Sequence, residues 1–193
     1  MLPPRARGYG YAPDCWIVSM LRPLCRALLA LGVAVALAAC SSFGTNVPTS
    51  TTSPTQMSQG SMLAAINEAR RANGGHKPMS YNAQLEAACK IQVGLMVQKD
   101  VLAHDAGMKL RARTDQAGYR GAVGENLAGG QQTLEGAIEG WLNSPGHRAT
   151  LLSDKFVEFG MAVQRMPEDR KGRYGIYWCF IAGGPFEAWI VRG

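Results

Sequence analysis

The sequence predicts an α+β fold, because helical and strand patterns are both present and do not alternate one for one. Helical periodicity dominates from Met62 to Asn143, and strand-like apolar runs follow in the last third of the chain. Such an order favours separate layers of helices and strands. The chain contains no internal repeat.

The first two predicted helices are long and amphipathic. Residues 62–73 place Leu63 and Ile66 on one side, and Gly74-Gly75 ends this helix. Asn82 is a suitable N-cap for the second helix. Its side chains expected to share the inner face are Leu85, Ala88, Cys89, Gln92, Leu95 and Met96.

Two shorter helices are predicted farther along. Residues 109–116 form a short helix that ends at Gly118. Thr133 caps another helix over residues 134–143, and we expect Pro145 to terminate it.

Residues 157–164 and 174–181 are predicted strands, joined by a charged loop over residues 167–173. Trp141 and Trp178 each sit in an apolar pattern, so we expect both indoles in the core rather than on a ligand-binding surface.

The N-terminus is typical of an exported protein. Residues 27–39 form an uninterrupted apolar run that is too short to span a bilayer but suits the h-region of a signal peptide. The run ends in Leu37-Ala38-Ala39-Cys40, which resembles a bacterial lipobox. We therefore expect residues 1–39 to be removed and Cys40 to be lipidated. The alternative is an ordinary small-residue cleavage site with an incidental cysteine.

Residues 1–19 make a long prefix before this leader. A start at Met20 would leave Arg22 and Arg26 as a compact basic n-region, so Met20 is an alternative start.

Residues 40–60 are predicted to be the lipidated cysteine and a flexible tether, and residues 61–193 the folded domain. After Cys40 the segment is rich in Ser, Thr and Pro and carries no charge. Ser41 resembles the residue found in lipoproteins sorted to the outer membrane of Gram-negative bacteria. In such a cell we expect a membrane-anchored domain that faces the periplasm.

Charge and cysteine content both change when the leader is removed. Loss of residues 1–39 takes away four arginines and one aspartate, which lowers the formal net charge from +6 to +3. The remaining charges are dispersed, so nucleic-acid binding is not predicted. The domain keeps only Cys89 and Cys179. An oxidising envelope permits a disulfide between them, and two buried free thiols are the alternative.

Two motifs carry the most chemical information. They are Gly124-Glu125-Asn126-Leu127-Ala128 and Trp141-Leu142-Asn143-Ser144-Pro145-Gly146-His147-Arg148. Together they resemble the signature of the bacterial branch of the CAP superfamily (cysteine-rich secretory proteins, antigen 5, pathogenesis-related 1). The likeness continues in Ile66-Asn67-Glu68-Ala69-Arg70, Lys77-Pro78-Met79-Ser80-Tyr81-Asn82 and Tyr177-Trp178-Cys179-Phe180. It implies an α-β-α sandwich with a three-stranded, mainly antiparallel sheet between helices.

The resemblance also implies a cleft lined by His104, Glu125 and His147. The second glutamate of many eukaryotic members is replaced here by Ser144. Two imidazoles and one carboxylate would suit Zn²⁺ or another divalent metal, with an open position for water. Without the resemblance, Glu125 would fix a turn, His147 would cap a segment, and His104 would be an exposed residue at a helix end.

A Ser144-His147-Glu125 arrangement is a further alternative, but no nucleophile elbow surrounds the serine.

Three functions remain. The sequence favours a lipid-anchored, noncatalytic module that binds an envelope ligand such as a glycan, a lipid or a protein. The others are a metal-dependent hydrolase acting on envelope material and a structural or host-interaction antigen. The sequence leaves oligomeric state undetermined.

Overall fold

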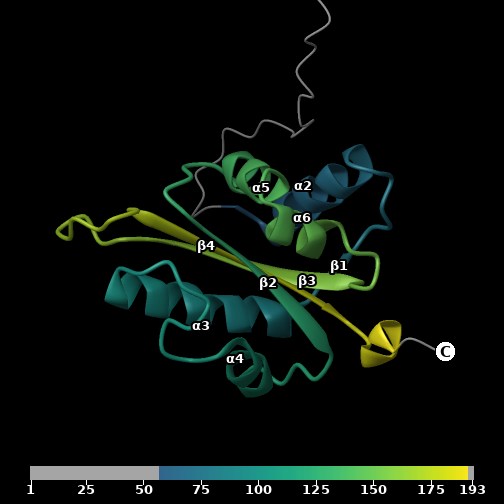
Figure 1. Ribbon diagram of the computed structural model, residues 1–193. Helices are drawn as coiled ribbons and strands as arrows, with labels where there is room; N and C mark the ends of the chain where they lie inside the picture. The colour runs from purple at the N-terminus through teal and green to yellow at the C-terminus, as the bar shows by residue number, and fades with distance from the viewer. Residues whose placement is uncertain (1–56, 191–193) are drawn as a thin grey trace, which may run out of the picture. The chain divides into compact units, whose positions relative to one another are not determined.

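The computed structural model of the chain describes residues 57–190 (Figure 1). The predicted signal peptide, Cys40 and all of the tether before Met57 lie outside these residues. Within them, no helix combines the length and the apolar character that crossing a membrane requires.

A mixed four-stranded sheet lies at the centre of the fold, in the order β1-β3-β4-β2. β4 pairs antiparallel with both of its neighbours, and β1 pairs parallel with β3. The strands are β1 Ser80–Tyr81, β2 Ala122–Gly129, β3 Glu158–Arg165 and β4 Ile176–Gly184. The three-stranded sheet implied by the resemblance was therefore one strand short, because the two-residue β1 adds a parallel pairing with β3.

Helices cover both faces of the sheet, as Figure 1 shows. α3 (Ala83–Lys99) and α4 (Leu110–Gln116) lie on one side. α2 (Gln59–Ala72), α5 (Leu134–Leu142) and α6 (Pro145–Leu152) lie on the other. The α+β class and the α-β-α sandwich are confirmed.

β4 supplies side chains to both hydrophobic cores. All nine of its residues are buried. Trp178 and Phe180 point into the core under α2, α5 and α6, whereas Tyr177 and Cys179 point into the core under α3. Trp141 and Trp178 are 1% and 0% exposed, so both predicted core indoles are confirmed.

Polar caps start α3 and α5 where the sequence predicts them. The Asn82 side chain accepts hydrogen bonds from the backbone amides of Gln84 and Leu85, and Thr133 accepts one from Gly136. α2 begins three residues earlier than predicted, because Ser58 caps it.

The role expected of Pro145 was only half right. α5 ends at Leu142, before the proline, but Pro145 then occupies the first turn of a further helix, α6. Proline is well suited to this position because the first helical amides have no partner within the helix. As a result His147 lies in the first turn of α6 rather than in a turn that ends α5.

One glycine allows α3 to pack closely against the sheet. A Cβ atom at Gly160 in β3 would lie 2.0 Å from the backbone nitrogen of Glu86. The absence of a side chain at Gly160 therefore sets the separation between α3 and β3.

Candidate functional site

The site is organised around the Glu125 carboxylate. Glu125 lies on β2, and its side chain is only 2% exposed. Its Oε2 atom accepts a 2.8 Å hydrogen bond from Nδ1 of His104, and its Oε1 atom accepts one from Nη2 of Arg113. The strand position contradicts the alternative in which Glu125 fixes a turn.

Arg113 also holds the loop that carries His104. This arginine lies on α4 and is 0% exposed. Its Nη1 atom donates to the backbone oxygens of His104, at 3.0 Å, and of Met108. Arg113 therefore positions His104 through both the backbone and Glu125. Sequence reasoning missed Arg113, because a single arginine in a short helix rich in charged residues carries no signal of burial.

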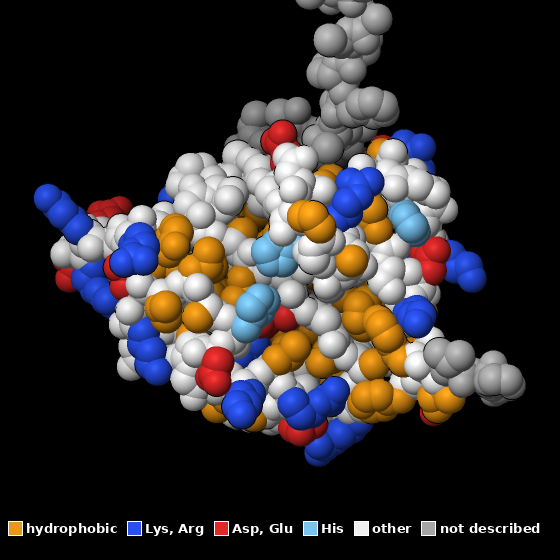
Figure 2. Space-filling view, viewed as in Figure 1, with side chains coloured by type: hydrophobic (Ala, Val, Ile, Leu, Met, Phe, Trp, Pro, Cys, Tyr) orange, Lys and Arg blue, Asp and Glu red, His pale blue; other side chains and the backbone are white. Residues whose placement is uncertain are grey.

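The His104 and His147 rings lie next to each other, with centroids 6.5 Å apart and planes tilted by 42°. His104 comes from the loop between α3 and α4, and His147 from α6. The Asn126 side chain donates a 2.8 Å hydrogen bond to the backbone oxygen of His147 and holds that turn against β2. Figure 2 shows histidine side chains side by side on this face, among hydrophobic ones.

The structure thus brings together all three residues named by the resemblance. His104 lies beyond the end of α3, which closes with Asp100, so it is not a helix-end residue. His147 is not a cap either, because Ser144 occupies the N-cap position of α6.

The two imidazoles have opposite pKa shifts. The hydrogen bond to Glu125 is the largest cause of the raised pKa of His104. Burial is the largest cause of the lowered pKa of His147, and the nearby charge of His104 adds to it. As pH falls, His104 takes up its proton first and His147 remains neutral longer.

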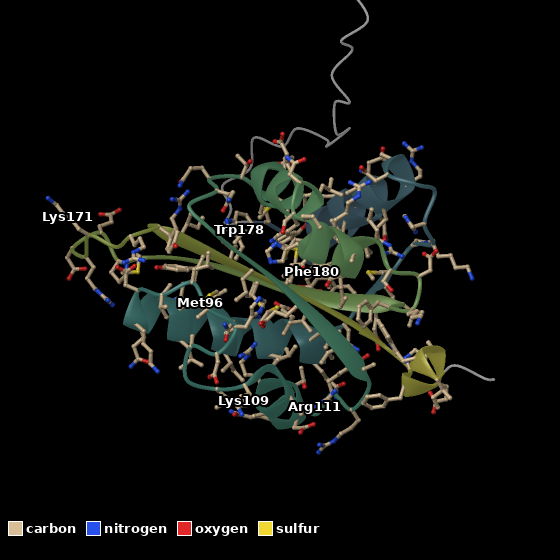
Figure 3. All side chains as sticks on the ribbon, in the orientation of Figure 1. Met96, Lys109, Arg111, Lys171, Trp178 and Phe180 are labelled. Carbon is tan, nitrogen blue, oxygen red and sulfur yellow. The ribbon has the colours of Figure 1, made fainter. Side chains whose placement is uncertain are left out.

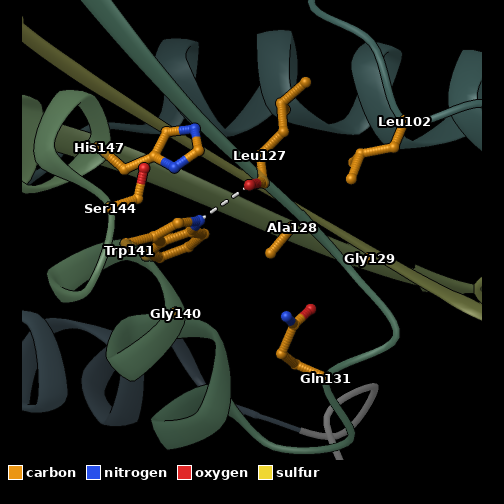
Figure 4. Close-up of a pocket in the computed structure, with 9 residues that line it drawn as sticks. All are labelled: Leu102, Leu127, Ala128, Gly129, Gln131, Gly140, Trp141, Ser144 and His147. Carbon is orange, nitrogen blue, oxygen red and sulfur yellow. Dashed lines mark hydrogen bonds between the residues drawn. The ribbon is translucent and has the colours of Figure 1, made fainter.

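A pocket of about 260 Å³ adjoins His147 between β2 and α5 (Figure 4). Its wall is mostly apolar, and Trp141 is fixed there by a 3.0 Å hydrogen bond from its indole nitrogen to the Leu127 backbone oxygen. The Oε1 atom of Gln131 is buried without a hydrogen-bond partner. The lining residues are Leu102, Leu127, Ala128, Gly129, Gln131, Gly140, Trp141, Ser144 and His147.

The arrangement is not a serine triad. Among the hydrogen bonds of residues 57–190, none joins the Ser144 hydroxyl to the His147 ring, and Glu125 orients His104 instead. A triad needs the carboxylate to orient the imidazole that activates the serine. The Ser144-His147-Glu125 alternative is therefore wrong.

The three residues also do not fit a three-ligand metal site. In the described part of the chain, no three His, Cys, Asp or Glu residues are placed to hold one ion. Arg113 and His104 each occupy one oxygen of Glu125, so this carboxylate positions a histidine rather than binding a metal. Only two imidazoles remain as ligands, one fewer than the three protein ligands of a typical catalytic zinc site.

Cys89 and Cys179 are fully buried, unbonded thiols beneath the site. Burial is the largest cause of the raised pKa of both thiols. Cys179 also contacts Glu125, with Sγ 3.8 Å from Oε1, and the Cys89 thiol donates to the Gly160 backbone oxygen at 3.5 Å.

Comparisons with known structures show where this fold occurs. An extracellular protein containing an SCP domain from Bacillus anthracis is 20% identical, with a TM-score of 0.54 over 65% of this chain and 39% of that chain. An outer surface protein from Borrelia burgdorferi is also 20% identical, with a TM-score of 0.54 over 65% of this chain and 91% of that one. At these identities the similarity establishes the fold alone.

Sequence comparison gives the family. The uncharacterized protein YkwD of Bacillus subtilis (strain 168) is 28% identical over 117 residues, which make up 58% of this chain and 46% of that protein. The chain thus matches less than half the length of this relative. A model of the cysteine-rich secretory protein family, CAP, matches residues 63–181, more than half of the chain. With both signature motifs inside that match, the chain belongs to the CAP, or cysteine-rich secretory protein, family.

Proposed function

We propose that this CAP domain works outside the cytoplasm, held to a membrane by lipid on Cys40, as a noncatalytic module that binds an envelope ligand. The apolar run over residues 27–39 and the lipobox-like residues before Cys40 support export and anchoring. The descriptions of the similar proteins, one extracellular and one an outer surface protein, agree with this location.

The pocket beside His147 is the observation that carries the binding role. Leu102, Leu127 and Ala128 give it apolar walls, while Gln131, Ser144 and His147 supply polar groups. Binding sites for small molecules commonly combine these two features. The pocket therefore suits a ligand with an apolar body and a polar head.

The His104 imidazole, which lies next to the pocket-lining His147, favours a ligand with a polar or anionic head. Glu125 neutralises the buried Arg113, and His104 has a raised pKa and a side chain that is 61% exposed. Because a protonated His104 adds positive charge, we expect tighter binding of anionic probes in mildly acidic solution.

A fluorescent probe with an apolar body and an anionic group, 8-anilinonaphthalene-1-sulfonate, tests the pocket directly. Gly140 lines the pocket, and a side chain there would meet Gln131 Nε2 at an ordinary 3.6 Å. Gly140→Leu should fill the pocket and weaken probe binding by about tenfold, a loss of about 1.4 kcal/mol.

Gly60→Leu is the matched control, because Gly60 lies on the surface of α2 and a Cβ there would meet only Ser58, at 3.7 Å. The control should bind the probe as wild type does, and thermal melts should show both variants folded. Equal probe affinity in all three proteins would exclude this pocket as the binding site.

The hydrogen bond between His104 and Glu125 favours a second candidate, a hydrolase. A carboxylate that orients an exposed imidazole is a common arrangement for a general base. Turnover of isolated envelope material by wild type, lost in His104→Asn with the fold intact, would establish this alternative.

A further inference from the structure

A separate surface, away from the pocket, concentrates the exposed hydrophobic side chains. Among the described residues, the large apolar side chains that are exposed are Val157, Phe186, Trp189 and Ile190, at 51%, 52%, 44% and 65%. Phe186 and Trp189 belong to the short 3-10 helix η2 (Phe186–Trp189) that follows β4. Figure 2 shows this hydrophobic area at the lower right of the molecule.

The same surface brings basic groups against the aromatic rings. The Arg111 guanidinium lies 5.6 Å from the centroid of the Phe186 ring. Lys155 Nζ lies 4.6 Å from the centroid of the Trp189 ring, and Trp189 packs on Phe156 with centroids 5.1 Å apart. We call Val157, Phe186, Trp189, Ile190, Arg111 and Lys155 the η2 patch.

No residue of η2 is buried, so the described domain does not cover its aromatic side chains. A cluster of exposed apolar side chains commonly marks an interaction surface, whereas single exposed apolar residues are ordinary. A partner of this patch has to accommodate aromatic rings that have cations beside them.

We propose that the η2 patch docks on the anionic surface of a phospholipid bilayer. Tryptophan and phenylalanine partition into the interface of a bilayer, where lysine and arginine contact the phosphate groups. Each basic residue near an anionic leaflet adds attraction. Two acidic residues also belong to this region. Glu187 lies in η2, and Asp115 is paired with Arg111 and Arg120.

A second copy of the chain fits the patch less well. In a symmetric dimer the same surface meets itself, so Arg111 and Lys155 of one copy would approach those of the other. Like charges that meet at an interface oppose association, whereas the anionic surface of a bilayer attracts them.

Trp189 offers a readout confined to the patch. In the chain from Ser41 onward the other tryptophans are Trp141 and Trp178, at 1% and 0% exposed. This shortened chain retains the whole family match, residues 63–181, and lacks Cys40, so no lipid can attach it to vesicles. A blue shift of tryptophan emission on adding vesicles then reports burial of Trp189.

The experiment compares vesicles of phosphatidylcholine mixed with phosphatidylglycerol and vesicles of phosphatidylcholine alone. We expect wild type to sediment with the anionic vesicles and its emission to shift to the blue. Lys155→Glu should bind at least about tenfold more weakly. Trp189→Phe should still sediment but lose the emission shift.

Lys171→Glu is the matched control, since it makes the same charge change at an exposed residue that Figure 3 places far from Arg111. It should bind nearly as wild type does. Gly140→Leu should also bind vesicles normally, which separates this proposal from the pocket. Equal binding by Lys155→Glu and Lys171→Glu, no binding by wild type, or a dimer that Phe186→Ser disrupts would each overturn the proposal.

Discussion

Nδ1 of His104 lies 2.8 Å from Oε2 of Glu125, so an exposed imidazole is held by a carboxylate that is itself buried. Arg113 occupies the other oxygen of that carboxylate from beneath. The exposed part of the site is therefore positioned by a residue that no ligand in the cleft has to touch.

We predict that Glu125→Gln destabilises the protein by about 3–5 kcal/mol, because it leaves Arg113 as a buried charge without its partner. Urea unfolding measures the change. Glu68→Gln is the control, since Glu68 pairs with Arg71 in an exposed contact, and its effect should be small. A loss no greater than that of the control would show that the buried pair does not stabilise the fold.

We also predict that His104 titrates at a higher pH than His147, which NMR of the ring protons can measure. A raised pKa in the folded state contributes stability below the pKa of the unfolded residue, about 6.5, and that stability is lost as pH rises through the folded value. The lowered pKa of His147 acts in the opposite direction.

Two variants separate these effects. His104→Asn should lower stability most below about pH 6.5 and progressively less as pH rises. His147→Asn should make the protein relatively more stable than wild type in acid, because a group that resists protonation has been removed. Parallel pH profiles for both variants would contradict the opposite shifts.

Gly160→Ala should lower the free energy of unfolding by about 3 kcal/mol or more, since the new Cβ would overlap the backbone of α3 at Leu85 and Glu86. Backbone atoms cannot turn away as a flexible side chain can. In Gly94→Ala, within α3, the Cβ would meet only Gln164, at 3.9 Å. The free energy of unfolding of that variant should rise by about 0.4–1 kcal/mol. Thermal melts of the two variants decide the point, and similar melting temperatures would show that α3 shifts to make room.

Cys89 and Cys179 are free thiols in the same core, and we predict that they become joined by a disulfide when the protein folds in an oxidising envelope. In the loop-entropy model, a disulfide that closes the long loop between them would stabilise the fold by at most about 4–5 kcal/mol. Intact mass of protein recovered from cells, with and without reductant, measures the state. A mass unchanged by reductant means that both thiols stay free.

Cys40→Ala should convert a membrane-bound protein into one that no longer partitions into the detergent phase. The basis is the lipobox-like run before Cys40, because two or three acyl chains give stable attachment whereas one gives only marginal binding. Ser41→Ala serves as the control and should partition as wild type does. Equal partitioning of the cysteine variant and wild type would remove the lipid anchor from the proposal.

Local signals in the sequence predicted much of the fold. Asn82 and Thr133 cap helices as expected, since a cap depends on a few neighbouring residues. Pro145 was misjudged, because proline can follow one helix or begin the next, and only the surrounding packing decides between these.

The site was predictable only in part. The family motifs named His104, Glu125 and His147, but not which of them contact each other. Arg113 could not be identified, because its burial depends on partners in β2 and in the His104 loop, 12 and 9 residues away, which the periodicity of its own short helix does not reveal. The carboxylate that was expected to bind a metal is instead shared between a guanidinium and an imidazole.

β4 has a consequence for how the protein is made. This strand is buried along its whole length, lies between β3 and β2, and is the last strand in chain order. Neither core can close until Ile176–Gly184 has emerged, so the nascent chain stays incompletely folded during most of its synthesis. If the chain is exported, as we propose, this late completion of both cores keeps it unfolded while it crosses a secretion channel.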